Sequence, residues 1–352
     1  MTAETDILFA RRGTAGIVTL NRPQALNAVT HAMVRSLAAQ LAEWAKEPAL
    51  TRVLVVAAGG RAFSAGGDLR ALYDLGKARR YDEALQFWHD EYMLNTLIKR
   101  YPKPYVALID GIVMGGGVGI SVHGSHRVAG DRFQFAMPEV GIGFFPDVGA
   151  TWFLPRLPGE LGTYCALTGE RMRNADAVPA GVATHYVPSA RFAELIEALT
   201  GAAPVENVLG DFADKLGIGP LSVYRKAIDR LFAGGRVEDI LAALDAEAIS
   251  RSAEAGWAGA TSAAMRGKCP LSMKLALAQM RRGREWSFTE CMKAEYRIVS
   301  RIIHGHDFYE GVRAVIIDKD NAPRWKPERL VQVPDADVEA HFAPLDSELP
   351  LP

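Results

Sequence analysis

Two unbroken apolar runs, each followed by a glycine-dense segment, limit the possible folds more than any other feature. The runs Val53–Ala57 and Tyr105–Ile109 each have the length of one strand. Strands without a polar face are typical of parallel sheets, which are covered on both sides. Between residues 30 and 46, Val34, Leu37 and Leu41 recur at helical spacing ahead of the first run. Strands that alternate with helices predict an α/β fold with layers of helix on sheet.

The pattern changes near residue 204. Farther along, helical periodicity dominates, as in Ile240, Leu241 and Leu244. We therefore predict a core over residues 1–204 and a mostly helical region over residues 205–352. The run Val312–Ile317 fits either a strand or a helix, and the proline-rich stretch from Asn321 predicts an extended tail.

The composition indicates a folded core and argues against nucleic acid as a binding partner. Hydrophobic residues make up 49% of the chain, which is enough for a sizeable core. The 40 Lys and Arg residues balance 41 Asp and Glu residues, giving a formal net charge of −1. A chain without a strong positive field is not expected to bind nucleic acid as its main partner.

The N-terminal stretch, the longest apolar stretch and the cysteines indicate where in the cell the protein is expected. The stretch Met1–Phe9 has no apolar run, and the apolar stretch Val106–Val122 is interrupted by Asp110 and several glycines, so neither a signal peptide nor a membrane span is expected. The three cysteines, which lie far apart with no C-x-x-C pair, predict a reducing compartment without disulfides or a zinc site: Cys165, Cys269 and Cys291. The expected location is the cytoplasm, with no membrane partner and no metal.

The glycine-dense segments are residues 62–69, which contain Gly66 and Gly67, and residues 114–119, which contain Gly115, Gly116 and Gly117. Such a strand–glycine–helix junction can expose backbone N–H groups that bind an anion. It can also simply allow close packing of a helix on a sheet. Neither segment fits G-x-G-x-x-G or G-x-x-x-x-G-K-[ST], so nucleotide binding of those types is not indicated.

Acidic residues provide the candidate chemistry. Glu139 and Asp147, eight positions apart, lie among apolar residues and glycines. They are either desolvated groups with raised pKa values, suited to acid–base work, or residues of a surface loop. Residues from Leu69 to about Arg100 form a long, charged stretch that predicts a helix, and Glu91, taken alone, is interpreted as part of its solvated face.

Considered in order, several motifs resemble the crotonase (enoyl-CoA hydratase/isomerase) superfamily. They are Asn21-Arg22-Pro23 with Ala25-Leu26-Asn27, the segment Ala62–Leu69, Gly115-Gly116-Gly117 and Pro138-Glu139. The segments Phe144–Gly149 and His306–Asp320 are similar to the branch of this superfamily that hydrolyses 3-hydroxyisobutyryl-CoA in valine catabolism. The resemblance implies a spiral of ββα turns followed by a mostly helical C-terminal region.

The resemblance also implies roles for individual residues. The N–H groups of Gly67 and Gly116 would form an oxyanion hole for the thioester carbonyl, and Glu139 and Asp147 would be the catalytic acids. Glu91 falls on a substrate-contacting glutamate, and the other residues at the acyl-CoA site would be Leu26, Ala65, Asp68 and Leu69. Glu139 and Asp147 are predicted to face one pocket with the two glycines. Coenzyme A enters as part of the substrate, so no cofactor is expected.

One departure separates the branches of the superfamily. Hydratases carry a second catalytic glutamate two residues after the glycine triplet, where this chain has Gly119, and usually glycine where it has Asp147. The resemblance therefore implies thioester hydrolysis, with an enoyl-CoA hydratase or isomerase as the alternative. It also implies a homo-oligomer, either a trimer or a hexamer.

Overall fold

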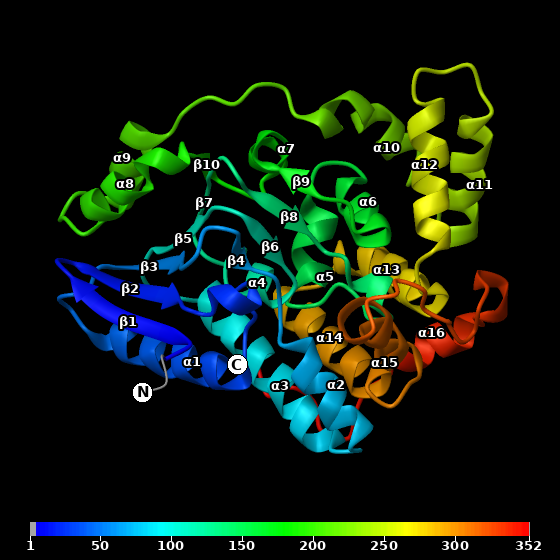
Figure 1. Ribbon diagram of the computed structural model, residues 1–352, viewed down its shortest axis with the longest axis horizontal. Helices are drawn as coiled ribbons and strands as arrows, with labels where there is room; N and C mark the ends of the chain where they lie inside the picture. The colour runs from blue at the N-terminus through cyan, green and yellow to red at the C-terminus, as the bar shows by residue number, and fades with distance from the viewer. Residues whose placement is uncertain (1–4, 352) are drawn as a thin grey trace. The chain divides into compact units, whose positions relative to one another are not determined.

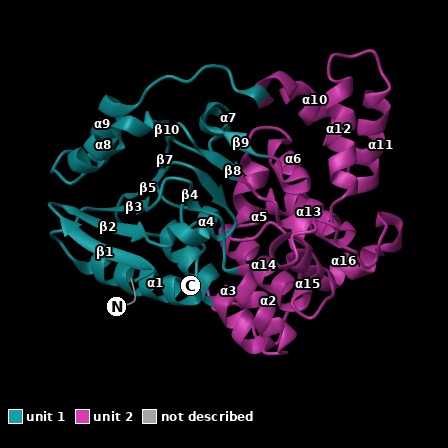
Figure 2. Ribbon diagram, in the orientation of Figure 1, with its two compact units in different colours: residues 1–68, 90–135, 171–220 teal, residues 69–89, 136–170, 221–352 magenta. Residues whose placement is uncertain are grey.

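The computed structural model describes residues 5–351 and divides them into two compact units (Figure 2). Unit 1 comprises residues 1–68, 90–135 and 171–220, and unit 2 comprises residues 69–89, 136–170 and 221–352. The first four residues of the stretch Met1–Phe9 lie outside the described part. The predicted boundary at residue 204 falls within the last stretch of unit 1, and that division of the chain stays a prediction.

The strands of unit 1 form two sheets by a regular rule. For three consecutive pairs of strands, between residues 52 and 136, the first strand joins a six-stranded sheet and the second joins a four-stranded sheet. The six-stranded sheet has the order β1 (Ile7–Arg12), β2 (Ala15–Leu20), β3 (Arg52–Ala57), β5 (Tyr105–Ile109), β7 (His126–Ala129) and β10 (His185–Tyr186). The four-stranded sheet has the order β4 (Ala62–Ser64), β6 (Ile112–Met114), β8 (Gln134–Ala136) and β9 (Met172–Arg173).

This rule produces the ββα turns. The pairs β3/β4 and β5/β6 are followed by α2 (Leu69–Lys77) and α4 (Gly116–Gly119), respectively. Strands β2, β3, β5 and β7 pair in parallel, with Val18 opposite Val55 and Leu108 opposite Val128. Each glycine-dense segment therefore leaves a short strand of the smaller sheet and enters a helix.

Helices cover both faces of the larger sheet. Side chains from α8 (Phe192–Leu199) and α9 (Val205–Phe212) share a buried cluster with alternate residues of the strands, including Ile17, Leu54 and Val106 (Figure 1). Trp44, near the end of α1 (His31–Lys46), lies against Gly16 of β2. Since Gly16 and Ile17 point to opposite faces, the parallel strands are apolar on both, as the sequence predicted.

Several boundaries differ from prediction. Thr30 caps α1 by accepting the N–H of Met33, as expected for an N-cap. The predicted helical stretch from Leu69 to about Arg100 is interrupted at Arg79, which has φ +59°, and so forms α2 and α3 (Tyr81–Lys99). Residues 307–317 are helical, with α15 (Asp307–Val312) running into a π-helical turn, so the helical alternative is correct there.

The tail is not wholly extended as predicted, because α16 (Asp335–Phe342) lies within it and buries Val338 and Phe342. The other helices are α5 (Ala150–Phe153), α6 (Leu161–Thr168), α7 (Asn174–Ala180), α10 (Arg225–Leu231), α11 (Val237–Ala248), α12 (Ala255–Arg266), α13 (Pro270–Gly283) and α14 (Phe288–Ile302). No helix within residues 5–351 is long and apolar enough to cross a membrane.

The close approach of Trp44 to β2 makes Gly16 sensitive to substitution. A Cβ atom at Gly16 would lie 2.5 Å from Cε3 of the Trp44 ring, which is buried. We expect Gly16→Ala to lower the free energy of unfolding by about 1–3 kcal/mol through overpacking. Urea unfolding measures the change, with Gly210→Ala as the control, because nothing lies within 4 Å of the new methyl group there. An unchanged midpoint for Gly16→Ala would contradict the described packing.

Candidate functional site

The predicted site residues fall into two groups, and each group is described by itself. Leu26, Ala65, Gly67, Asp68, Glu91 and Gly116 belong to unit 1. Glu139 and Asp147 belong to unit 2, as does Leu69, the first residue of α2. That the two groups face one pocket stays a prediction.

In unit 1, backbone hydrogen bonds join residues 26–29 to residues 65–68. The N–H of Ala65 donates to the carbonyl of Leu26 at 3.0 Å, and the N–H of Asp68 donates to the carbonyl of Val29 at 3.0 Å. The backbone of Leu26 has φ +51°, which lies in the left-handed region. The structure thus brings Leu26, Ala65, Gly67 and Asp68 together, as the resemblance implied.

Two polar side chains fix this arrangement. The buried side chain of Asn27 donates to the carbonyls of Ala58 and Ala62 and accepts the N–H of Arg22. The guanidinium of Arg22 forms an ion pair with Asp68 at 3.2 Å. The Arg22–Asn27 motif therefore holds the glycine segment that follows β4.

Gly116 lies beside Gly67 at the start of α4. A Cβ atom built on Gly116 would lie 3.3 Å from the nitrogen of Gly67 and 2.5 Å from Oε1 of Glu91. No hydrogen bond joins the N–H of Gly67 or of Gly116 to an acceptor in the part of the chain that the structure describes. Backbone donors in a folded protein are normally paired, so two neighbouring donors without acceptors are suited to bind one oxyanion.

Glu91 is not on a solvated face. Its side chain is 2% exposed, and its carboxylate lies against Gly116. Asn95, one turn farther along α3, is fully buried, and neither of its side-chain polar atoms has a hydrogen-bond partner among residues 5–351. Residues four apart share a face of a helix, so the sequence could have suggested Asn95 once Glu91 was chosen.

In unit 2, Glu139 begins a 3-10 turn, Glu139–Ile142, and is 5% exposed. Its Oε2 atom has no hydrogen-bond partner within the described residues. Burial raises the pKa of Glu139 well above its ordinary value, and the charges of Asp147 and Glu295 raise it further. Of the two alternatives left open by the sequence, the structure therefore supports the desolvated acid.

Asp147 is also buried, with 4% exposure, and lies within electrostatic range of Glu139. The two residues that follow it, Val148 and Gly149, have φ values of +53° and +88°. Positive φ is rare for a β-branched residue such as Val148, so the backbone here is strained. Glu139 and Asp147 thus belong to one buried acidic cluster, and the raised pKa of Glu139 is a feature common at functional sites.

The third acid in this cluster was not among the predicted site residues. Glu295 on α14 is fully buried, and its two oxygens accept the N–H groups of Gly149 and Thr151. Burial raises its pKa to about 8, against the opposing effect of these hydrogen bonds. The available signal was an acid within the apolar stripe that contains Cys291, Ile298 and Ile302.

The segment 306–326 supports the turn that carries Glu139. A Cβ atom on Gly143 would collide with the carbonyl of Asp307, and one on Gly311 would collide with the backbone of Ile142. Phe308 and Phe144 pack with ring centroids 5.4 Å apart. Close contact through two glycines therefore places α15 directly against the turn.

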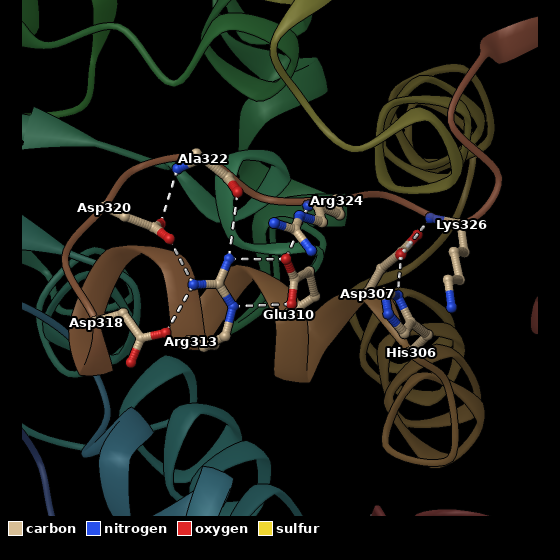
Figure 3. Close-up of polar contacts among 9 residues, drawn as sticks. All are labelled: His306, Asp307, Glu310, Arg313, Asp318, Asp320, Ala322, Arg324 and Lys326. Carbon is tan, nitrogen blue, oxygen red and sulfur yellow. Dashed lines mark hydrogen bonds and ion pairs between the residues drawn. The ribbon is translucent and has the colours of Figure 1, made fainter.

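Ion pairs hold the chain beyond α15 (Figure 3). The Arg313 guanidinium contacts Glu310 at 2.8 Å, Asp318 at 2.8 Å and Asp320 at 2.7 Å. The N–H of Lys326 donates to Asp307 at 2.8 Å. The residues of the His306–Asp320 motif are therefore bound to one another, and their role in this structure is support.

Comparison with known proteins agrees with this architecture. The sequence matches the enoyl-CoA hydratase/isomerase family over residues 15–342. The chain therefore belongs to that family. A 3-hydroxyisobutyryl-CoA hydrolase from Danio rerio is 44% identical over 354 residues, which cover 98% of this chain and 91% of the relative. The corresponding protein from Homo sapiens is 41% identical, with 98% and 90% covered.

Solved structures are equally similar. A structure described as a carnitinyl-CoA dehydratase from Mycobacterium thermoresistibile has a TM-score of 0.92 and 43% identity and covers 98% of both chains. An enoyl-CoA hydratase from Rhodobacter sphaeroides 2.4.1 has a TM-score of 0.89 and 39% identity, covering 97% of this chain and 98% of its own. The predicted family and the α/β crotonase fold are thus confirmed.

Location and assembly stay predictions. The curated relatives are named as mitochondrial proteins, so a cytoplasmic location does not follow from the comparison. The trimer or hexamer and the absence of a cofactor are likewise expectations that these findings leave open.

The first prediction from the site concerns Gly116. In Gly116→Ala the methyl group would collide with Glu91 and crowd the N–H of Gly67. We expect turnover of an acyl-CoA thioester to fall about 10²–10³-fold, the effect of losing one oxyanion donor. Steady-state kinetics measure the loss, and Gly210→Ala on α9 is the matched control. Normal turnover by folded Gly116→Ala would show that this pair of donors does not bind the reacting oxygen.

The second prediction concerns pH and Glu139. A carboxyl group whose pKa is higher in the folded than in the unfolded chain makes the folded state bind more protons, so stability falls as pH rises between the two values. Glu139→Gln removes this effect. We expect the variant to match the wild type near pH 5 and to be more stable at pH 8, the difference growing by up to about 1.4 kcal/mol per pH unit.

Urea unfolding at pH 5, 6, 7 and 8 tests this expectation. Glu194→Gln, which changes an exposed glutamate on α8, serves as the control. Parallel pH curves for the wild type and Glu139→Gln would contradict a raised pKa at Glu139.

Proposed function

We propose that this protein hydrolyses an acyl-CoA thioester, converting 3-hydroxyisobutyryl-CoA and water to 3-hydroxyisobutyrate and coenzyme A. The observation that carries the proposal is the buried pair Glu139 and Asp147: burial raises the pKa of Glu139, and the charge of Asp147 raises it further. The names of the curated relatives support the same substrate.

The N–H groups of Gly67 and Gly116 hold the thioester carbonyl in this proposal. As water or a carboxylate adds to the carbonyl carbon, negative charge develops on its oxygen. Donors that are already fixed and unpaired stabilise that charge without rearrangement. Their positions are set by backbone hydrogen bonds and by contact with Glu91, so they depend little on any one exposed side chain.

Glu139 acts on the carbonyl carbon. As a base it takes a proton from the attacking water, and as a nucleophile it forms an anhydride that water then opens. Both routes release the coenzyme A thiol and leave a carboxylic acid. Single turnover in ¹⁸O-labelled water distinguishes them, because attack of water on the Glu139 carbonyl of an anhydride transfers an unlabelled oxygen to the product.

Asp147 orients the 3-hydroxyl of the substrate or the attacking water. Its negative charge also keeps the pKa of Glu139 high, which makes that carboxylate a stronger base. Glu91 contacts the acyl group beside Gly116. The remaining residues of the proposed acyl-CoA site are Leu26, Ala65, Asp68 and Leu69.

A hydratase is the second candidate, because solved structures of 39–43% identity are described as a hydratase and a dehydratase. Addition of water across a double bond needs a second positioned acid. Gly119, the last residue of α4, occupies the place where hydratases carry that acid. The hydrolase is therefore the better supported function.

Release of free thiol decides between these functions. The enzyme is supplied with 3-hydroxyisobutyryl-CoA, 3-hydroxypropionyl-CoA or crotonyl-CoA, and the thiol is followed with a chromogenic reagent. We expect thiol from the two hydroxyacyl substrates and no loss of the crotonyl double bond. Hydration of crotonyl-CoA without thiol release would replace the hydrolase by the hydratase.

The residue-level prediction concerns Asp147→Asn, which removes the carboxylate and keeps the side-chain shape. We expect the turnover number to fall about 10²-fold or more, as for loss of a positioned acid–base group. Glu139→Gln should be at least as damaging while acyl-CoA binding stays measurable. Asp211→Asn, at an exposed site on α9, is the control. Wild-type turnover by Asp147→Asn would remove Asp147 from the mechanism.

A further inference from the structure

The loop that carries Asp147 is held by buried side chains from two C-terminal helices. Gln279 on α13 donates to the carbonyl of Pro146 at 2.9 Å and to Oγ1 of Thr151 at 2.7 Å. Glu295 on α14 accepts the N–H of Gly149 at 2.7 Å and the N–H of Thr151 at 2.9 Å. Hydrogen bonds therefore fix the backbone immediately before Asp147 and two residues after it.

The backbone between these anchors is strained. Val148, next to Asp147, has φ +53°, a conformation that a β-branched side chain rarely adopts. Such a residue keeps this geometry only when its surroundings enforce it. Glu295 and Gln279, both fully buried, hold the backbone on either side of Val148, and the carbonyl of Asp147 also accepts the N–H of Ala150 at 2.9 Å.

Holding a loop with a buried acidic side chain lowers the stability of the fold unless the acid is well hydrogen-bonded. Burying an acid costs free energy unless hydrogen bonds satisfy it, and apolar replacements of buried charges often stabilise a fold. Glu295 also lies within electrostatic range of Asp147, and both groups are acidic. Stability alone therefore does not account for a glutamate at this position, whereas its carboxyl group offers two acceptor oxygens, one for each N–H group.

We propose that Glu295, assisted by Gln279, is a positioning residue for the reaction: its carboxyl group holds the strained 147–149 backbone and so fixes the Asp147 carboxyl group. This inference rests on the proposed role of Asp147. Glu295 does not touch the substrate. It acts through the loop.

Glu295→Gln tests the inference, because it keeps the length of the side chain but replaces one acceptor with a donor. At least one of the N–H groups of Gly149 and Thr151 then loses its acceptor. We expect amide hydrogen exchange in the segment 146–153 to become at least about tenfold faster. We expect the turnover number to fall about 10²-fold, the scale of a misplacement of roughly 1 Å, with KM changed less than about threefold.

Val299→Ala is the matched control. Val299 is buried on the same helix, so its truncation destabilises α14 without removing the carboxylate. We expect a lower melting temperature with normal exchange in 146–153 and a normal turnover number. A fall in turnover equal to that of Glu295→Gln at equal destabilisation would mean that Glu295 is merely structural and would overturn the inference.

A double variant separates the inference from the proposed function. If Glu295 acts through Asp147, adding Glu295→Gln to Asp147→Asn lowers turnover no further. A further full 10²-fold loss in the double variant would overturn the inference. A wild type that releases no thiol would refute the proposed function, and with it the positioning role of Glu295 in that reaction. Unchanged amide exchange in Glu295→Gln would show that Glu295 does not hold the 147–149 backbone, whatever the reaction.

Discussion

The burial of three carboxyl groups within electrostatic range of one another is the constraint on which unit 2 depends. Glu139, Asp147 and Glu295 are at most 5% exposed. A buried charge must be hydrogen-bonded or neutralised. Glu295 is satisfied by two backbone N–H groups, but Glu139 keeps one oxygen without a partner among the described residues. The proposed reactive group is thus the one with an unsatisfied oxygen, so in this proposal the cost to stability and the reactivity have the same origin.

In unit 1 the unsatisfied groups are backbone N–H donors, not carboxyl oxygens. Hydrogen bonds between residues 26–29 and 65–68 hold the backbone around Gly67. The N–H groups of Gly67 and Gly116 themselves have no acceptor in the described part of the chain. Only glycine fits at Gly116, because any Cβ atom would meet the Glu91 carboxylate. The glycine density seen in the sequence therefore reflects both close packing and donor exposure, the two interpretations that the sequence could not separate.

Local pattern was enough to predict the long buried strands, and for Glu139 it offered desolvation as one of two interpretations, the one that the structure supports. It was not enough for strands of two or three residues such as β4 and β9, which are too short to show a period. It also failed for Glu295 and Gln279, because their partners lie more than a hundred residues earlier in the chain. Such contacts are made by packing, and a single sequence carries no periodicity that marks them. The helix α16 was missed because prolines surround it and only Val338 and Phe342 are buried.

Overall similarity does not identify the reaction in this family. Relatives named as hydrolases are 41–44% identical to the chain, and a structure described as a dehydratase is 43% identical with a TM-score of 0.92. The reaction must therefore be argued from the site, since one fold supports several chemistries. In this chain the donors proposed to bind the carbonyl belong to unit 1, whereas the loop that carries Asp147 is held by side chains of α13 and α14 in unit 2. Substitutions in those helices can thus change how Asp147 is held without disturbing Gly67 and Gly116.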